Sequence, residues 1–448
     1  MREKFIEEIF ISAQAEGVEE IEVHMTSRTI LEINVFQKEV EKYAISSEDN
    51  LAVRGIYKGK MGYSYTEKLE EASIEELLNN LKGYALANTR EELEKISDPH
   101  KIDARPQKKN GLLELSEEEK ITFLLDLERL TYERDARIKT VSNCSYKEFI
   151  EKVEIRNTKG LELASSSSLA LISLGVVTEE AGSMETGFGH RIITSLDESL
   201  KDYLIDQAAG DALAMLGAGP LAPARMEVIL RNQVAADLLA GFVPIFLASQ
   251  VQNKLSLLEG KQGTKIAMEG INIIEDPLME GGKVYRSFDD EASPTRRKYL
   301  VKDGTLETFL YNNATASRDG VESTGNGFRA SHKSSVGVEA TNIYLEPGSK
   351  SLEELIKTMD RGLVITEIHG LHAGINPVSG DFSLSSNGLL VEKGEIVRPV
   401  SKITMAGNLF KLLMEVREIG SDLGFSHPSG PFFGSPSLYV GELDISGK

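Results

Sequence analysis

The stretch EIEVHMTSRTILEINVFQKEVEKYAI, residues 20–45, alternates apolar and polar side chains over most of its length. A period of two is typical of β-strands that bury one face, so this stretch predicts extended strands. The following stretch, LAVRGIYKGKMGYSY (51–65), continues the pattern, with Gly59 near a turn. We therefore expect an antiparallel meander near the N-terminus.

Helices are predicted on both sides of this meander. Four apolar residues in 5–10 recur at the i, i+3, i+4 spacing of an amphipathic helix. SIEELLNNLKGYALAN (73–88) opens with Ser73, which can cap a helix, and has glutamates in its first turn. Residues 1–100 are thus predicted to form an N-terminal α/β domain in the order helix, meander, helix.

The same order recurs in the next segment. SEEEKITFLLDLERLTYERD (116–135) and LDESLKDYLIDQAAGDALAMLG (196–217) predict helices on either side of long strands. The serine-rich stretch 163–178 predicts a buried strand and is too short for a membrane span. We therefore expect a middle α+β domain over 111–218, which makes a second helix–β-meander–helix block.

Residues 225–448 are predicted to form a C-terminal β-rich domain. After the apolar stretch VAADLLAGFVPIFLASQV (234–251), most segments are short strand patterns separated by glycine turns. That apolar stretch contains Asp237 and Pro244, which predicts a buried helix broken at the proline. SLEELIKTMDRG (351–362) and NLFKLLMEVREIGSD (408–422) predict two further helices. The predicted fold class is α+β, with the two blocks followed by a large, twisted, mainly antiparallel sheet or partial barrel.

Composition limits the function. The chain has 448 residues, 41% hydrophobic and 27% charged residues, and a net charge of −20. Such a charge opposes direct binding to nucleic acid, because phosphate neutralisation needs clustered Lys and Arg. The single cysteine, Cys144, excludes an intramolecular disulfide and suits a reducing compartment. We expect a cytoplasmic protein that does not enter a membrane.

Two histidines, His369 and His372, stand three residues apart in HGLHAG and raise the question of a metal site. In a helix they would share a face, but the neighbouring glycines argue against a helix, and in a strand they would point to opposite faces. We therefore expect a glycine-rich structural loop, with a metal site as the alternative. The chain contains no HExxH, no Cys-x-x-Cys and no Gly-x-Ser-x-Gly.

Three adjacent acids occur in SFDDEASPTRRKYLVKDG (287–304). Carboxylates in a polar turn are usually solvated, so the expectation is an exposed turn, with a Mg²⁺ or Ca²⁺ site as the alternative.

Five ordered motifs resemble one family. FDDEASPTRRKYLVKDGTLETFLYNNATASR, STGNGFR, NIYLEPGSKSLEELI, VSGDFSLSSNGLLVEKGEIVRPVSKITMAGNL and PSLYVGELDISG follow one another from residue 288 to residue 447. They closely resemble the modulator-of-gyrase family, the TldD/PmbA proteins. The resemblance covers the second half of the chain, and the two helix–meander blocks fit the family's first two domains.

The resemblance implies a cytoplasmic, dimer-forming zinc peptidase. Its TldD-type members carry His-Glu-x-x-x-His on the helix that opens the C-terminal domain, and a cysteine near the C-terminus. Here the matching helix, NQVAADLLAGFVPIF, has no histidine and only one acid, Asp237, and Ser426 and His427 stand in the region of the cysteine. These departures place the chain in the PmbA (TldE) branch, with no catalytic residue, no cofactor and no metal of its own. Zinc is then expected in a TldD-type partner.

The resemblance also implies a site and partners. Gly380, Asp381 and Phe382 stand in the family's glycine-rich turn and strand, where an extended or unfolded peptide could pair with the cleft by strand addition. A heterodimer with a TldD-type subunit, a homodimer, or both are expected, with contacts through the apolar helix of the C-terminal half. Two alternatives stay open: an independent hydrolase using His369, His372 or His427, and a binding or regulatory protein linked to DNA gyrase.

Overall fold

The structure is a computed structural model, and it describes residues 2–89, 95–102, 105, 107, 111–428 and 432–447. The two helix–meander blocks share one antiparallel sheet, whose strand order is β3-β2-β1-β4-β5-β6. The blocks join where β1 pairs with β4, from Glu22 opposite Asn157 to Asn34 opposite Ser145. The strands are β1 (Glu20–Phe36), β2 (Glu39–Tyr57), β3 (Lys60–Thr66), β4 (Ile138–Asn157), β5 (Glu162–Glu180) and β6 (Ser183–Ile193).

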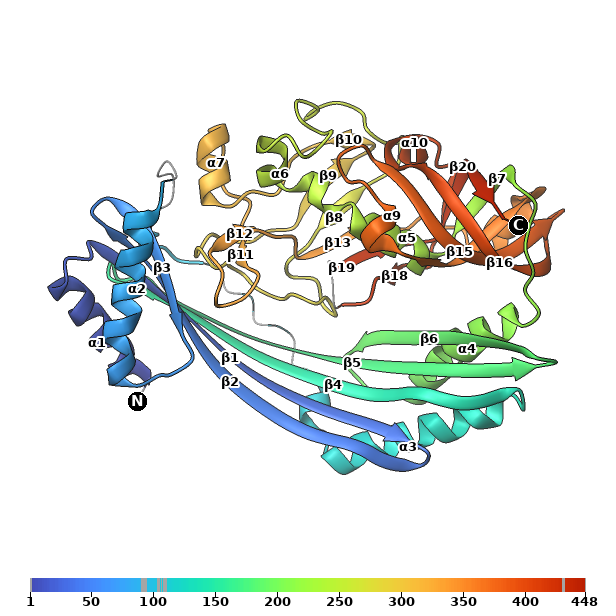
Figure 1. Cartoon of the computed structure of the whole chain (residues 1–448), viewed down its shortest axis with the longest axis horizontal. Helices are drawn as coiled ribbons and strands as arrows, with labels where there is room; N and C mark the ends of the chain where they lie inside the picture. Colours follow the sequence, from blue (N-terminus) through green and yellow to red (C-terminus); the bar gives the residue numbers. More distant parts are fainter. Residues whose placement is uncertain are drawn as a thin grey trace.

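The strands are long and curl into a half-barrel (Figure 1). Helices α1 (Arg2–Ala15) and α2 (Ile74–Ala87) cover one end, and α3 (Glu117–Arg134) and α4 (Glu198–Met215) cover the outer side of the other. Alternation explains this packing, because Leu31, Ile33 and Val35 of β1 share one face and are buried in a core with α3 and α4. The predicted helices and strands of both blocks are confirmed.

The two predicted serine caps differ in outcome. Ser116 forms a capping box with Glu119 at the start of α3, as the sequence predicts. The Ser73 hydroxyl instead donates to the carbonyl oxygens of Lys68 and Glu70, so it does not cap α2. A 3₁₀ turn, Glu71–Ser73, precedes α2 and places Ser73 in a helical conformation that points its hydroxyl backward.

The C-terminal half contains a small closed barrel and a second sheet. The barrel strands are β7 (Ala224–Leu230), β14 (Arg361–His369), β15 (Asp381–Glu392), β16 (Glu395–Asn408) and β20 (Leu438–Ser446), and pairing of β16 with β20 closes it. The short strand β17 (Glu418–Ile419) extends it at β20. Most pairs are antiparallel, whereas β7 and β14 are parallel. The predicted α+β fold class is confirmed, and the predicted sheet or partial barrel of this half is a closed barrel beside a second sheet.

The second sheet has the order β10-β9-β8-β13-β19-β18, and β11 and β12 form a separate hairpin. These strands are β8 (Ile273–Glu275), β9 (Lys298–Lys302), β10 (Thr305–Leu306), β11 (Gly327–Arg329), β12 (Val336–Val338), β13 (Asn342–Leu345), β18 (Gly424–Phe425) and β19 (Phe432–Ser435). Figure 1 shows this half of the chain lying over the concave side of the half-barrel.

The apolar stretch 234–251 forms α5 (Asn232–Gly241), a 3₁₀ turn at Val243–Phe246 and α6 (Ala248–Gln252), so the predicted break at Pro244 is confirmed. The other helices of this half are α7 (Asn313–Asp319), α8 (Leu352–Thr358), α9 (Leu371–Gly374) and α10 (Leu409–Met414). The predicted helix over 408–422 is therefore much shorter than expected. It ends because the chain turns back into β17, which pairs with β20.

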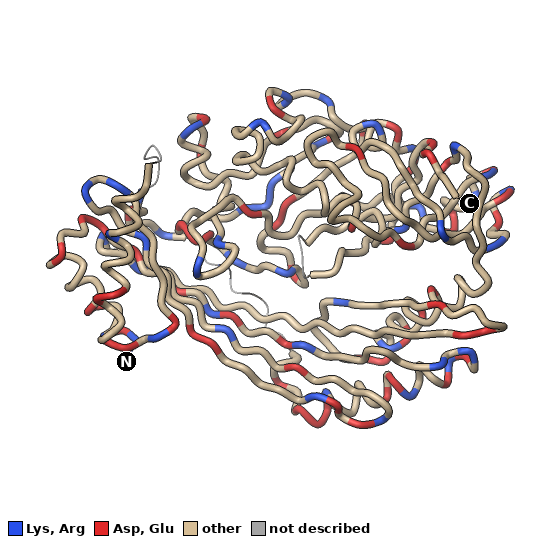
Figure 2. The backbone as a smooth tube through the Cα atoms, viewed as in Figure 1, with Lys and Arg blue, Asp and Glu red and all other residues tan. Residues whose placement is uncertain are grey.

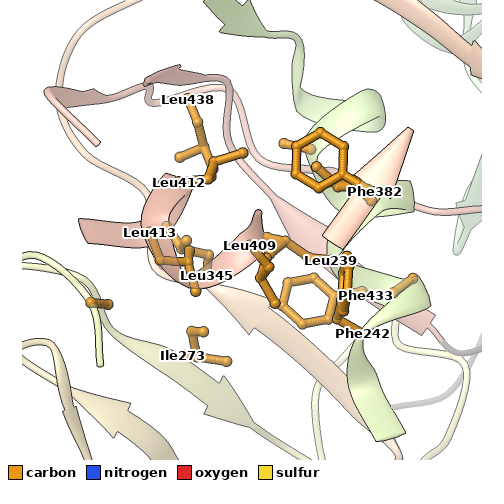
Figure 3. Packing of buried hydrophobic residues seen from close by; sticks show 14 of the residues in the cluster. Leu239, Phe242, Ile273, Leu345, Phe382, Leu409, Leu412, Leu413, Phe433 and Leu438 are labelled. Carbon is orange, nitrogen blue, oxygen red and sulfur yellow. The ribbon is translucent and has the colours of Figure 1, made fainter. Parts of the chain in front are cut away.

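The main core of the C-terminal half surrounds α5. Leu239 and Phe242 pack with Leu409, Leu412 and Phe433 in one buried cluster (Figure 3). The expectation that this apolar helix needs a partner subunit to cover it is wrong, because strands of the same chain already bury it.

Basic and acidic residues both occur along the strands of the half-barrel (Figure 2). Among the described residues, no helix is both long enough and apolar enough to cross a membrane. Cys144 lies in β4 and is buried, and burial raises the pKa of its thiol, which keeps it protonated and therefore a poor nucleophile.

Candidate functional site

Arg231 anchors the start of α5 at the boundary between the two halves. Its guanidinium forms a bidentate ion pair with Asp211 of α4, with 2.7 Å between Nη2 and Oδ2. Nη2 also donates to the carbonyl oxygen of Thr366 in β14 at 3.2 Å. These contacts hold the first turn of α5 against α4, which belongs to the half-barrel, and against the barrel strand β14.

One stripe of α5 stays partly accessible. Gln233, Asp237 and Gly241 are spaced four apart and are half-buried, whereas Val234, Ala235, Leu238 and the other apolar residues face the core. Asp237 is the only acid on the helix, and burial raises the pKa of its carboxyl to about 6. The stripe therefore presents one carboxyl group that gives up its proton only near neutral pH.

The predicted histidine loop sits directly on this stripe. A Cβ on Gly241 would fall 2.3 Å from Cδ1 of Ile375, so α5 and the segment after α9 are in direct contact and a larger residue at 241 would require the Ile375 side chain to move. The expectation of a loop without helix is wrong for 371–374, because Gly370 adopts a left-handed φ of 80° and a single helical turn, α9, follows it. Gly370 supplies the reversal that lets the turn start immediately after β14.

The two histidines have separate surroundings. His369 ends β14 and lies 3.3 Å from Glu367, and its side chain is about half exposed. His372 lies in α9 and is exposed. Within the described ranges, no group of three His, Cys, Asp or Glu side chains could hold a metal ion. The structural-loop interpretation therefore fits the geometry better than the metal-site alternative.

His427 packs against a histidine from the other half of the chain. The ring centroids of His427 and His190 lie 5.0 Å apart at 61°, and Phe188 contacts both rings. His190 and Phe188 come from β6, the edge strand of the half-barrel. The pair therefore marks the place where the half-barrel meets the C-terminal half.

Both imidazoles are kept neutral at physiological pH. Burial, together with the neighbouring His427, lowers the pKa of His190 to about 4. Burial also lowers the pKa of His427, with contributions from Lys147 and Lys283. The Nδ1 atom of His190 is buried without a hydrogen-bond partner. The two rings therefore meet uncharged where the two halves join, a contact that the sequence did not reveal.

The predicted cleft residues lie at another pocket. Asp381 and Phe382 line a pocket of about 390 Å³ between β15, β16, β20 and α10. Asp381 accepts a hydrogen bond from Nδ2 of Asn408 at 2.8 Å, and this bond lowers the pKa of its carboxyl. Gly380 has a φ of 80° and no room for a side chain, because a Cβ would lie 2.8 Å from the ring of Phe410. Their role in binding a peptide stays a prediction.

The acidic stretch 289–291 is buried, so the expectation of a solvated turn is wrong. The three side chains are sealed by residues of the N-terminal block and by their own hairpin. Asp290 accepts hydrogen bonds from Nε2 of His24 at 3.0 Å and from Nη1 of Arg286 at 2.6 Å. Glu291 accepts a hydrogen bond from Nη1 of Arg54 at 3.1 Å. The desolvation cost of these buried carboxylates is offset because basic side chains from β1 and β2 form ion pairs with them.

The three carboxylates point toward different partners, which argues against a shared cation. Asp289 accepts backbone N–H groups of Glu291, Ser293 and Gly327 at 2.8 to 2.9 Å. Burial raises the pKa of Asp289, and the nearby charge of Glu291 adds to this effect. Burial alone would also raise the pKa of Asp290, but His24 and Arg286 reverse the shift and lower it. The Mg²⁺ or Ca²⁺ alternative therefore finds no support in this geometry.

Sequence reasoning missed the residues that join the two halves. His24, Arg54 and His190 drew no attention, because each meets its partner only through tertiary pairing, across more than two hundred positions for His24 and Arg54. One signal was available for Arg54. It stands inside an apolar strand pattern, LAVRGIY, where a charged side chain on a buried face needs a partner.

Comparisons with known proteins agree with this architecture. Residues 22–86, 110–216 and 223–447 match domain 1, the central domain and the C-terminal domain of the PmbA/TldA metallopeptidases. The chain is 26% identical to the metalloprotease PmbA of Escherichia coli O157:H7, over 92% of this chain and 89% of that protein. It is 28% identical to a metalloprotease TldD homologue of Haemophilus influenzae, over 89% and 86%.

Solved structures share the whole fold. A Thermotoga maritima protein, whose name proposes a role as a modulator of a DNA gyrase, superposes with a TM-score of 0.87 at 30% identity and covers 100% of both chains. TldE from Thermococcus kodakarensis has the same fold, with a TM-score of 0.89 at 22% identity over 99% of this chain and 100% of that one. By its three matched domains and this fold, the chain belongs to the PmbA/TldA metallopeptidase family.

Proposed function

We propose that this chain is a PmbA (TldE)-type subunit, non-catalytic by itself, that completes a metallopeptidase with a TldD-type partner. The observation that carries the proposal is α5, the helix that opens the C-terminal domain. Its accessible stripe presents Gln233, Asp237 and Gly241 and no histidine. In the family resemblance, this is the helix on which the catalytic members carry His-Glu-x-x-x-His.

The residues present do not fit zinc. A catalytic zinc site uses three protein ligands drawn from His, Asp, Glu or Cys, and α5 provides one carboxyl group whose pKa is about 6. His369 and His372 are exposed at the end of β14 and in α9, and the described part of the chain holds no cluster of three suitable ligands. No hydrolytic step is therefore assigned to a metal on this chain.

The remaining contribution of the chain is positioning. Holding an extended substrate in a reactive orientation lowers a barrier by several kcal/mol, on the order of 7 kcal/mol in favourable cases, without a chemical group from the positioning subunit. The junction around His190 and His427 places neutral imidazoles and the exposed ring of Phe188 between the two halves. Such a surface can contact a peptide while a partner supplies the ion.

A surface for a partner is available on β2. β3 pairs only with Leu51–Tyr57, so in the described chain the outer edge of β2 from Glu39 to Asn50 has no strand beside it. Tyr43 and Ile45 on this edge are 44% and 55% exposed. Unpaired N–H and C=O groups with apolar side chains invite strand pairing with another subunit.

The two alternative functions have less support. An independent hydrolase would need His369, His372 and His427 to act together, yet His427 packs on His190 while the other two follow β14. A direct role on DNA is opposed by the net charge of −20 and by the mixed charges of the half-barrel.

The test measures peptide cleavage by this chain, by a purified TldD-type subunit and by the mixture, with an unfolded peptide library as substrate. The proposal expects no cleavage by this chain alone and strong cleavage by the mixture. Cleavage by this chain alone that persists after removal of any contaminating partner would overturn it. Failure of the two subunits to form a complex would overturn the assigned partnership.

A further inference from the structure

A groove of about 590 Å³ lies between the N-terminal block and the C-terminal half. One wall is α2 with the neighbouring strand β3, and the other is the loop between β11 and β12. We call it the α2 groove. The residues that line it are Tyr63, Ser64, Tyr65, Glu76, Asn79, Asn80, Gly83, Tyr84, Arg329, His332, Lys333, Ser334 and Ser335.

The α2 wall is one face of the helix. Glu76, Asn79, Asn80, Gly83 and Tyr84 follow the i, i+3, i+4, i+7, i+8 spacing of a single stripe. The opposite stripe, with Leu77, Leu78, Leu81 and Ala85, is buried in the core of the N-terminal block. Only the apolar stripe of α2 therefore packs in the core of the N-terminal block, and the other stripe faces the groove.

Packing within the chain does not require a glycine at position 83. A Cβ at this position would meet nothing within 4 Å, whereas a Cβ on Gly62 in the adjacent strand would lie 2.2 Å from the carbonyl oxygen of Leu81. Glycine in the middle of a helix weakens that helix relative to alanine. Because Gly83 has no side chain, the backbone of α2 is exposed to the groove at this position, and a bound molecule can approach it closely.

The facing wall is held in place by ion pairs and hydrogen bonds. Nη1 of Arg329 donates to the carbonyl oxygen of Ser334 at 2.8 Å, and the backbone N–H of Arg329 donates to Asp290 at 2.9 Å. His332 and Lys333 both contact Oε1 of Glu67 at 2.9 Å. The loop is thus tied both to the buried acidic stretch and to the N-terminal block, and the groove is preformed.

The chemistry of the groove selects the class of ligand. Tyr63 and Tyr84 meet edge to face with ring centroids 5.4 Å apart, and the side-chain amides of Asn79 and Asn80 are exposed and make no hydrogen bond within the described residues. Each amide offers donors and an acceptor, which match the N–H and C=O groups of a peptide backbone. Tyrosine, serine, asparagine and glycine are also the residues that dominate protein-recognition surfaces.

Charge argues against a phosphate-bearing ligand. Arg329 and Lys333 are the cations of the groove besides His332, and Glu76 on α2 and Glu67 beside Lys333 balance them. An anion as strong as a phosphate needs uncompensated cations or a ring of backbone N–H groups. A neutral peptide backbone needs neither.

We propose that the α2 groove binds an extended segment of an unfolded polypeptide. Asn79 and Asn80 hydrogen-bond its backbone, the exposed ring of Tyr84, which packs on the buried Tyr63, contacts a side chain, and the segment lies against α2 at Gly83. This binding site belongs to the single chain. It does not depend on the proposed partnership, because it can be measured without a TldD-type subunit.

The experiment measures binding of fluorescein-labelled, reduced and carboxymethylated lactalbumin to the full chain by fluorescence anisotropy. The test variants are Gly83→Ala and the double variant Asn79→Ala/Asn80→Ala. The matched control is Gly210→Ala, because Gly210 is also an exposed glycine inside a helix, α4, with nothing within 4 Å of a Cβ. Both glycine variants are expected to raise the melting temperature slightly, because alanine favours a helix.

The proposal expects saturable binding that Gly83→Ala weakens by about tenfold, equivalent to about 1.4 kcal/mol, while Gly210→Ala leaves it unchanged. The asparagine variant should weaken binding similarly without unfolding the chain. No binding to the wild-type chain, or equal binding to the Gly83→Ala and Gly210→Ala variants, would overturn the proposal. Displacement of the labelled protein by ADP or inorganic phosphate would also overturn it, since the ligand class would then be wrong.

Discussion

Nη1 of Arg54 in β2 lies 3.1 Å from Oε1 of Glu291, and both side chains are sealed from solvent. Nε of the same guanidinium donates to Glu22 in β1 at 2.7 Å. One cation therefore neutralises carboxylates from both halves of the chain. Because a buried charge keeps its desolvation cost when its partner is lost, this contact should govern how firmly the halves are joined.

Arg54→Met tests that role. The change leaves Glu22 and Glu291 buried without their cation, so the free energy of unfolding should fall by about 3–5 kcal/mol. Urea unfolding followed by circular dichroism measures it. The control is Arg129→Met, which removes an exposed arginine paired with Asp126 and Glu133 on α3 and should cost less than about 1 kcal/mol. Similar losses for the two variants would show that the buried pair does not join the halves.

Asp237 should make stability depend on pH. Burial raises its pKa to about 6 in the folded chain, above its value in the unfolded chain. The folded state therefore holds this proton more tightly. Its favourable contribution is complete below about pH 4 and is lost as the pH rises through about 6. The total is below about 3 kcal/mol, because the side chain is only half-buried and solvent screens it.

The measurement compares wild type with Asp237→Asn in urea at about pH 5 and about pH 8. The variant should gain stability relative to wild type at the higher pH, since it cannot carry the buried charge. An equal difference between the two proteins at both pH values would show that Asp237 titrates normally.

Metal content is a third prediction. The purified chain should hold no stoichiometric zinc, since α5 offers one carboxyl group and the histidines of β14 and α9 stand apart from it. Elemental analysis after gel filtration measures this, with a TldD-type subunit prepared in parallel as the positive control. Zinc near one equivalent that disappears in His369→Ala or His427→Ala would contradict the prediction.

The open edge of β2 gives a fourth prediction. Ile45→Lys places a charge in the unpaired edge and should weaken the complex with the TldD-type subunit by at least about tenfold. Light scattering of the mixed subunits measures the complex. Ile11→Lys on α1 is the matched control, because Ile11 is 68% exposed and lies away from this edge. If both variants assemble as wild type does, the partner binds elsewhere.

The sequence predicted local structure well wherever a pattern repeats along the chain. The alternation in 20–45, the capping box at Ser116 and the break at Pro244 each depend on neighbours in sequence, and each is confirmed. The family resemblance rested on five ordered motifs and is confirmed by the matched domains.

The sequence predicted poorly wherever tertiary contacts decide the outcome. The acids at 289–291 were predicted to form a solvated turn because their basic partners, His24 and Arg54, lie more than two hundred positions away in the sequence. The apolar helix α5 read as a subunit contact because its covering strands, β18 and β19, come near the end of the chain. His190 and His427 gave no local sign of their contact.

The most direct test of the central claim measures kcat of the reconstituted complex, with peptide substrate, a wild-type TldD-type subunit and variants of this chain. If the chain is non-catalytic, Asp237→Asn and the combined change of His369 and His372 to Gln should each leave kcat within about twofold of the wild-type complex. A fall of about a hundredfold or more in kcat, with the complex still assembled, would mean that this chain supplies a catalytic group and would contradict the account.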